Sequence, residues 1–306
     1  MSNFPLLKLP YLCIEAVILN LSCHDIVIFS YISKKTCRLV KSFKSPVTSM
    51  RLYLEDGASC LNLEPMEVQW KKSNQLSQEI IEDINYFTSL FRCSVHYLQI
   101  DGDYLPEDNI DFGFDKLKKL LISGTKEINN DKLKYLLEQF EVTETIIVDI
   151  PISRTFYCDP KLFKAKFVSF SGGKSAGWIT ADFLSQLPRE AIQKLGFEHP
   201  QFTIQDVVSV ITEWFQFKVP LLKFLVADLN VPIEPSDLED KCFKLMAFSP
   251  ERRPYGFLDR TGEIIDFTSG LDIVRSDGQL ATIIVEGTAF LFHVWSEDEK
   301  RSLSSS

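Results

Sequence analysis

The chain has 306 residues, and its composition is that of a globular protein with room for more than one domain. Hydrophobic residues make up 45% and charged residues 25% of the chain, which excludes a collagen-like or wholly disordered protein. Lys and Arg number 33 against 42 Asp and Glu, so the formal net charge is −9. Because binding to a phosphate backbone needs a basic footprint, we expect no nucleic-acid partner.

The N-terminus and the cysteines predict the compartment. The first ten residues contain Pro5 and Pro10 and no basic run, which is not typical of a secretory signal peptide. No stretch of 18 uncharged apolar residues is present, so we expect no membrane partner. The seven Cys are odd in number and never spaced CxxC, and the four His are scattered. We therefore predict no disulfide framework, metal site or cofactor, and a location in the cytoplasm or nucleus.

The segment from Leu9 to Phe43 predicts three helices. Pro10 suits the first turn of a helix, apolar residues then recur at helical spacing, and Ser22 can cap the second helix. The third helix must end before Ser45, because a residue that precedes proline resists the helical conformation. Three helices of this length cannot bury all their large apolar side chains among themselves. We therefore expect something else to cover them.

From about residue 47 the pattern changes to short strands that alternate with helices about every 20 to 30 residues. The predicted strands are Val95–Ile100, Leu117–Ile122, Thr145–Asp149, Lys166–Phe170, Ile192–Phe197 and Leu221–Val226. The predicted helices are Asp131–Phe140, capped by Asn130, then Thr180–Leu187, and Thr203–Phe215, capped by Thr203. A strand and a helix repeated at this period indicate an irregular α/β solenoid similar to leucine-rich repeats.

After Pro235 the pattern predicts an antiparallel β meander that caps the solenoid. Its expected strands are Phe243–Phe248, Gly262–Phe267, Leu271–Arg275, Gln279–Glu286 and Thr288–Trp295. Between the third and fourth strands, Ser276-Asp277-Gly278 predicts a hairpin turn of type I′. Residues 296–306 are charged and then Ser-rich, so we predict a disordered tail.

Two motifs raise the question of catalysis. Ser171-Gly-Gly-Lys-Ser175 lacks the first glycine of a phosphate-binding loop, because Val168 stands in its place. Gly173-Lys-Ser-Ala-Gly177 has the GxSxG spacing of a nucleophile elbow, but Trp178 and the residues around it postpone the helix that an elbow needs directly after its Ser. We therefore expect a plain loop here and no catalytic residue.

A serine hydrolase at Ser175 stays open as a remote alternative. His293 follows it along the chain, with Asp228 or Asp272 between them, in the order that hydrolases of this kind use.

Two sets of residues form patterns known from protein families. The N-terminal segment contains Leu9-Pro10, Ile14, Val17, Ile18, Leu21, Asp25-Ile26, Phe29-Ser30, Ile32–Lys35 and Arg38–Phe43. This pattern resembles an F-box. The second half contains Trp178–Thr180, Phe183-Leu184, Ile192, Thr203–Asp206, Ile211, Trp214, Arg275–Gly278, Ala281–Ile283 and Val294-Trp295. This second pattern resembles the F-box-associated domain of type 2 found in the large nematode-type F-box families.

The resemblance implies an α+β and α/β chain with an F-box over residues 4–45, a leucine-rich-repeat-like substrate-binding domain over 46–295, and a tail over 296–306. It also implies a substrate-recognition subunit of a Skp-cullin-F-box type ubiquitin ligase, which is not itself an enzyme. An F-box protein that engages the adaptor without ubiquitylation is the alternative. The expected adaptor-binding residues are Leu9, Pro10, Ile14, Val17, Ile18, Ile26, Phe29, Ser30, Ile32 and Ser33. The resemblance assigns no substrate-binding residue.

Overall fold

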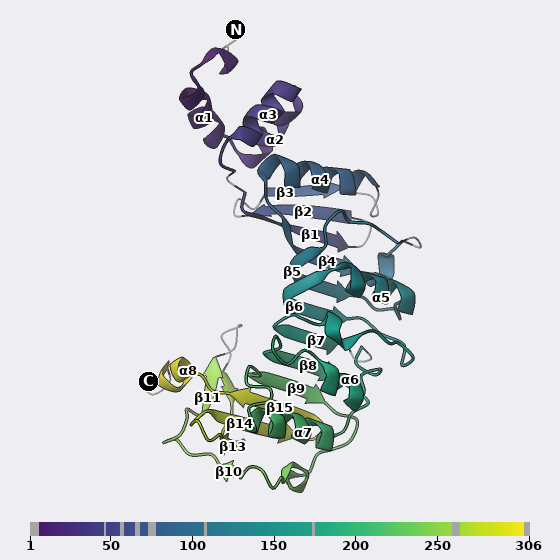
Figure 1. Cartoon of the computed structure of the whole chain (residues 1–306), viewed down its shortest axis with the longest axis vertical. Helices are drawn as coiled ribbons and strands as arrows, with labels where there is room; N and C mark the ends of the chain where they lie inside the picture. The colour runs from purple at the N-terminus through teal and green to yellow at the C-terminus, as the bar shows by residue number, and fades with distance from the viewer. Residues whose placement is uncertain are drawn as a thin grey trace. The chain divides into compact units, whose positions relative to one another are not determined.

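The computed structural model describes residues 6–45, 47–55, 58–64, 68–72, 78–106, 109–172, 175–258 and 264–302. Its contacts divide the chain into two units, Met1–Leu120 and Leu121–Ser306. Three N-terminal helices are followed by a mixed α/β region with a large sheet (Figure 1). Within the described ranges, every helix is too short or too polar to cross a membrane.

The first unit begins with a short 3-10 turn, Leu6–Lys8, and the three predicted helices α1 (Tyr11–Leu19), α2 (Cys23–Tyr31) and α3 (Lys34–Ser42). Ser22 caps α2, because its hydroxyl accepts a hydrogen bond from the Asp25 amide at 3.1 Å. Ser33 and Thr36 form a reciprocal capping box at the start of α3. These short polar side chains explain why the helices begin where they do.

Four strands at one end of the large sheet and a helix complete the first unit. The strands β1 (Ser49–Glu55), β2 (Ala58–Glu64) and β3 (Val68–Lys72) form an antiparallel meander, and β4 (Val95–Asp101) pairs with β1 in parallel. Parallel pairing needs a crossover, which α4 (Gln78–Phe91) supplies. We did not predict β1, β2, β3 or α4. The 3-10 turn Gly102–Tyr104 follows β4, and β5 (Lys116–Ser123) spans the boundary between the units.

The N-terminal helices contact α4 directly. Tyr31 of α2 stacks on Tyr86 at 4.7 Å between ring centroids, and the hydroxyl groups of Ser30 and Tyr86 lie 2.6 Å apart. The ammonium group of Lys41 in α3 donates to the hydroxyl oxygen of Ser89 at 2.5 Å. The expected boundary between residues 45 and 46 therefore falls inside the first unit. Pro46 itself lies outside the described residues.

The second unit is built on four parallel strands in sequence order, β6 (Glu141–Asp149), β7 (Phe167–Ser171), β8 (Lys194–Glu198) and β9 (Phe224–Asp228) (Figure 1). The helix α5 (Asn130–Gln139) precedes β6, while the 3-10 turn Pro160–Leu162, α6 (Ala181–Gln186) and α7 (Ile204–Phe215) lie in the connections. The six predicted strands correspond to β4 to β9, although β9 begins at Phe224 and not at Leu221.

The cap predicted for α5 was off by one residue. Asn129, and not Asn130, accepts hydrogen bonds from the amides of Asp131 and Lys132, at 2.9 and 3.2 Å. Both asparagines could serve as caps, and the sequence offers no means of choosing between them. The predicted caps Thr180 and Thr203 are confirmed: the Thr180 hydroxyl accepts from the Phe183 amide, and Thr203 shares a capping box with Asp206.

The C-terminal part adds antiparallel strands to the sheet. After the 3-10 turn Pro235–Leu238, the strands β10 (Met246–Ala247), β13 (Leu271–Val274), β14 (Leu280–Glu286) and β15 (Ala289–Val294) follow in the order β10-β13-β14-β15-β9. The pair β11 (Gly256–Leu258) and β12 (Ile264–Asp266) forms a separate two-stranded sheet. The predicted strand over 262–267 therefore pairs outside the meander, and its first two residues, Gly262 and Glu263, lie outside the described part of the chain.

The turn between β13 and β14 is not of the predicted type I′. The amide of Gly278 donates to the carbonyl of Arg275, and the Arg275 amide donates to the carbonyl of Gln279, both at 2.9 Å. Gly278 has φ = 85°, whereas Asp277 is not among the described residues with positive φ. This is a three-residue loop with a left-handed glycine. It lets the Asp277 carboxylate accept hydrogen bonds from Arg275 and from the Gln279 amide.

A buried ion pair stabilises the antiparallel part. Asp272 and Arg253 have fully buried side chains, and the Arg253 Nε donates to Asp272 Oδ1 at 2.6 Å. Asp272 also accepts from the Thr282 hydroxyl at 2.9 Å, and Thr282 accepts from the indole N–H of Trp295 at 2.7 Å. Each charge is therefore compensated inside a core that also holds Phe267 and Leu280.

Removal of one partner of this pair should destabilise the chain strongly. Asp272→Ala leaves the Arg253 guanidinium buried without a counter-charge, so we expect the free energy of unfolding to fall by about 3–5 kcal/mol. Urea unfolding followed by tryptophan fluorescence measures this change. Glu286→Ala, at the exposed end of β14, is the matched control. A loss below about 1 kcal/mol for Asp272→Ala would contradict the compensated pair.

The structure has the helix α8 (Glu297–Ser302) inside the segment for which we predicted a disordered tail. Ser296 and Glu299 form a capping box: the Glu299 carboxylate accepts from the Ser296 amide at 2.7 Å, and the Ser296 hydroxyl accepts from the Glu299 amide at 3.3 Å. Burial raises the pKa of Glu299, but contacts with His293 and Ser296 outweigh it and lower the pKa to about 2. Residues 303–306 lie outside the described part of the chain.

The low pKa of Glu299 predicts a pH dependence of stability. A carboxylate with a depressed pKa stabilises the fold above its ordinary pKa of 4.5 and loses that contribution as the pH falls toward about 2. Glu299→Gln should therefore lower the free energy of unfolding at neutral pH, and its difference from the unsubstituted chain should shrink in that acidic window. Unfolding experiments at several pH values test this, with Asp298→Asn as control. A difference that stays constant with pH would rule the assignment out.

Candidate functional site

Exposed apolar side chains concentrate at the start of the chain. Of the 17 exposed large apolar residues in the described parts, eight lie between residues 7 and 32. We call these eight the N-terminal apolar surface: Leu7, Tyr11, Leu12, Val17, Leu19, Ile28, Tyr31 and Ile32. The other nine are spread from Tyr104 to Val274. Isolated exposed apolar residues are normal, but such a concentration in a short segment is typical of an interaction surface.

The composition of α1 and α2 produces this surface. In α1 the buried residues are Ile14 and Ile18, four positions apart, while Leu12 is 74% exposed and Val17 and Leu19 also face solvent. A helix that is apolar all round cannot bury every side against one neighbour. In α2 the same happens beyond the buried Ile26 and Val27, where Ile28, Tyr31 and Ile32 are exposed.

The helix α3 differs from the other two because it is charged. Lys34, Lys35 and Arg38 are exposed, whereas Thr36 and Val40 are buried. The N-terminal helices thus combine exposed apolar side chains with a set of basic ones. An apolar centre with a charged border is the usual composition of a protein–protein interface.

The structure separates the ten expected adaptor-binding residues into three groups. Ile14, Ile18, Ile26 and Ser30 are buried, Leu9 and Phe29 are partly buried, and Pro10, Val17, Ile32 and Ser33 are exposed. The buried side chains shape the helices, while the exposed ones are accessible to a partner. Ser30 donates to the Val27 carbonyl and contacts Tyr86, so its hydroxyl is already engaged.

Several exposed residues escaped the sequence reasoning. Tyr11, Leu12, Leu19, Ile28 and Tyr31 belong to the N-terminal apolar surface but were not among the expected adaptor-binding residues. Apolar residues at helical spacing mark the face that packs inside the chain. The exposed face of the helices could have been recognised from the large apolar residues that lie between these regularly spaced positions.

Ser175 has the environment of a structural residue. Its side chain is buried, and its hydroxyl donates to the carbonyl of Ser171 at the end of β7. Two residues of the motif, Gly173 and Lys174, lie outside the described part of the chain.

The other members of the possible triad lie elsewhere. His293 pairs with Phe224, the first residue of β9. Ser171 is the last residue of β7, which runs parallel to β8 and β9. The two residues therefore lie at opposite ends of the parallel strands. Asp272 is bound to Arg253, and Asp228 accepts from the Thr288 hydroxyl at 2.5 Å. The described residues therefore do not assemble a serine hydrolase centre around Ser175.

The cysteines and acidic residues also fail to form a reactive or metal-binding centre in the described ranges. No group of three or more His, Cys, Asp or Glu side chains there is placed to hold a metal ion. Burial raises the pKa of Cys23 and Cys93 to about 11 and that of Cys158 to about 12. Since the thiolate is the reactive form, these thiols are poor nucleophiles at neutral pH.

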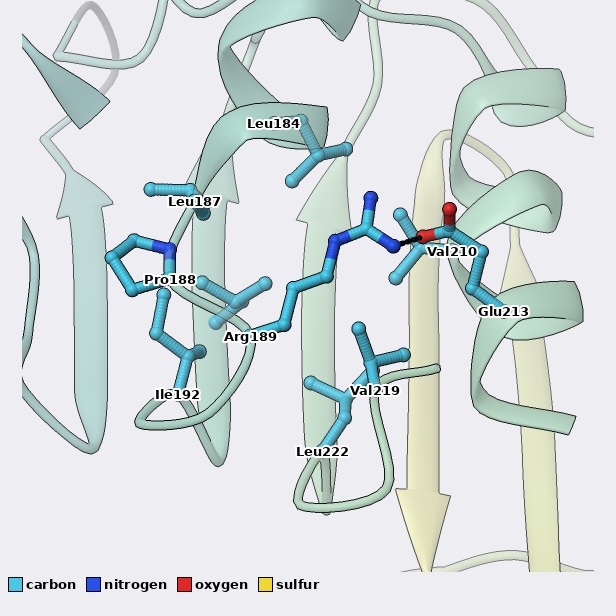
Figure 2. Close-up of a pocket in the computed structure, with 10 residues that line it drawn as sticks. Leu184, Leu187, Pro188, Arg189, Ile192, Val210, Glu213, Val219 and Leu222 are labelled. Carbon is cyan, nitrogen blue, oxygen red and sulfur yellow. Dashed lines mark ion pairs between the residues drawn. The ribbon is translucent and has the colours of Figure 1, made fainter. Parts of the chain in front are cut away.

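A small apolar pocket lies between α6, α7 and the sheet (Figure 2). Its volume is only about 30 Å³, and Leu184, Ile192 and Val210 contribute to its lining. Arg189 and Glu213 form an ion pair at 2.6 Å beside it, which links the end of α6 to α7. The charges at this pocket are thus already satisfied by each other.

Comparison with protein families agrees with the geometry of the N-terminal helices. The model of the F-box domain matches residues 6–48. Residues 6–48 form an F-box domain. F-box domains generally bind Skp-type adaptors. F-box proteins are typically adaptors and not enzymes.

One curated relative matches a region of the chain that is longer than the F-box. The chain is 28% identical over 177 residues to "Uncharacterized protein F59B2.8" of Caenorhabditis elegans. The matched region covers 53% of this chain and 40% of that protein, so the chain spans less than half of the relative's length. No solved structure matches the chain.

Buried and exposed F-box residues should respond differently to truncation. Ile26→Ala removes a side chain that is 1% exposed, so we expect the N-terminal helices to lose about 2–5 kcal/mol of stability. Leu12→Ala, at a site that is 74% exposed, should change stability by no more than about 0.5 kcal/mol. Hydrogen exchange of amides in α1, α2 and α3 measures both. Equal protection in the two variants would contradict the observed burial.

Proposed function

We propose that this chain is the substrate-recognition subunit of a Skp-cullin-F-box type ubiquitin ligase, acting in the cytoplasm or nucleus. The F-box docks on the Skp-type adaptor and, through it, on a cullin. Residues 46–295 act as an F-box-associated domain of type 2, with a leucine-rich-repeat-like arrangement, and select the protein to be ubiquitylated. The observation that supports this function is the N-terminal apolar surface on an F-box, which a partner protein would cover.

The energy of such an interface comes from a few anchors. A stable interface buries roughly 1,600 Å², and a handful of central apolar or aromatic side chains contribute most of its free energy. Leu12 and Ile32, 74% and 68% exposed, and Tyr31, 53% exposed, have the most apolar surface to lose. Ile14, Ile18 and Ile26 contribute indirectly, because they hold α1 and α2 in place from inside.

The proposed role needs no bond chemistry from this chain. A receptor that binds the ligase at one end and a target at the other raises the effective concentration of target lysines near the ubiquitin-carrying enzyme, to the millimolar range for a well-matched spacing. This agrees with the described residues, where Ser175 is buried and hydrogen-bonded.

Charge substitutions on the exposed face should abolish adaptor binding. Leu12→Asp combined with Ile32→Asp places two carboxylates in a contact that excludes water, and a cost of about 2.7 kcal/mol already weakens binding a hundredfold. The measurement is the affinity of the purified full chain for a Skp-type adaptor, followed by capture of the cullin. Val231→Asp, which alters an apolar residue that is 68% exposed in the second unit, is the matched control.

The outcomes separate the proposed function from its alternative. Loss of adaptor and cullin together in the double variant, with unchanged helix content and an unaffected control, supports the proposal. Undiminished adaptor binding in a folded double variant would disprove docking through this surface. Adaptor binding by the unsubstituted chain without capture of a cullin would instead favour an F-box protein that has no role in ubiquitylation.

A further inference from the structure

A cleft opens beyond the C-terminal ends of β6, β7 and β8, within the second unit. Its volume is about 190 Å³. Phe156 and Tyr157 come from the connection after β6, Trp178 and Phe183 from the connection after β7, and Gln201 from the connection after β8. Because these strands are parallel, their following connections meet at one edge of the sheet, which is where open α/β sheets bind ligands.

The floor of the cleft is a rigid aromatic cluster. Trp178 lies between Phe156 and Phe183, with ring centroids at 4.8 and 4.6 Å and near-perpendicular planes. All three rings are at most 5% exposed, and Phe163 and Phe170 pack behind them. A ligand that contacts this floor would therefore order few additional side chains, which favours binding.

The cleft has hydrogen-bond donors that no described residue satisfies. The indole N–H of Trp178 is buried and lacks an acceptor in the described ranges. Arg154 at the rim is exposed and forms no ion pair with any described residue. Two amide side chains of the lining are engaged: Gln186 donates to Asp182 at 2.8 Å, and Gln201 donates to the Gly177 carbonyl at 2.6 Å. Arg154 is thus available to pair with an anionic group of a ligand.

The local charge agrees with this requirement. The connection between β6 and β7, residues 150–166, contains four basic residues and one acidic residue. They are Arg154, Lys161, Lys164 and Lys166 against Asp159. The segment is therefore positive in a chain whose net charge is −9. Lys166 lies at the opposite edge, directly before β7, and Asp182 adds a carboxylate to the cleft lining. Arg154 is thus the positive charge of the lining that would attract an acidic partner.

We propose that the cleft binds a segment of the substrate protein in which a large apolar side chain lies next to a carboxylate. The apolar side chain packs against Tyr157, which is 71% exposed, and the aromatic floor, while the carboxylate pairs with Arg154. Tyr, Trp and Arg are the residue types that most often anchor protein–protein interfaces. The inference rests on the proposed function, because it assigns the surface with which that receptor recognises its substrate.

Short synthetic peptides test the assignment. Fluorescent peptides with a central Phe, Trp or Leu, flanked by Asp and Glu, by Ser, or by Lys, are titrated with the full chain, and polarisation gives the Kd. Arg154→Glu removes the ion pair and Tyr157→Ala removes the exposed ring, so each should raise the Kd of the acidic peptides at least about tenfold. Lys223→Glu, at the opposite edge of the same sheet, is the matched control and should leave the Kd unchanged.

Each result either supports the proposed peptide-binding role of the cleft or refutes it. Preference for acidic peptides in the unsubstituted chain and in Lys223→Glu, lost in Arg154→Glu and kept at weaker affinity in Tyr157→Ala, with unchanged thermal stability in both cleft variants, supports the assignment. No preference for acidic over Ser-flanked peptides, or equal affinity in all variants, overturns it. Adaptor binding is measured on the same samples: a chain that binds the adaptor but shows no acidic preference refutes the cleft alone and leaves the proposed receptor function standing.

Discussion

Parallel hydrogen bonding among β6, β7, β8 and β9 is the constraint on which the second unit depends. A parallel neighbour can be reached only by a crossover, so each strand is followed by a connection that returns to the same starting edge. Gly196 in β8 allows close packing within this ladder, because a Cβ there would lie 2.8 Å from the Ser169 hydroxyl oxygen. The antiparallel strand β15 then pairs with β9 and ends the parallel series. The aromatic cleft follows from this arrangement.

Large apolar side chains are buried in the second unit, whereas many of those in α1 and α2 are exposed. In the second unit, Trp214, Trp295, Phe170 and Phe292 are fully buried and contribute to cores inside the chain. In α1 and α2, side chains of similar size remain exposed although both helices are well formed and α2 is capped by Ser22. These side chains are exposed because the N-terminal segment is too short to bury them all, and not because its helices fail to pack. A binding module therefore explains the first forty residues better than an incomplete core does.

The sequence predicted many of the elements that have a strong local signal and missed others that have one. The three N-terminal helices and the strands β4 to β9 were predictable from apolar spacing and from caps such as Ser22 and Thr203. The meander of β1 to β3 was missed, although Met50, Leu52 and Leu54 alternate as in a half-buried strand. The outward face of the F-box and the cleft could not be predicted, because exposure depends on which helix face the rest of the chain covers and on which connections meet in space.

The stacked rings of Tyr31 and Tyr86 make the junction after the F-box stiff. With the Ser30–Tyr86 and Lys41–Ser89 contacts, they tie α2 and α3 to α4 at three points. A flexible linker samples many orientations, whereas a junction fixed by several contacts restricts the F-box helices and α4 to a narrow range of relative orientations. The angle at which an adaptor holds the F-box would thus be passed on directly to β1 and its neighbours. Under the proposed function, a rigid junction of this kind would limit the positions at which a bound target can present a lysine.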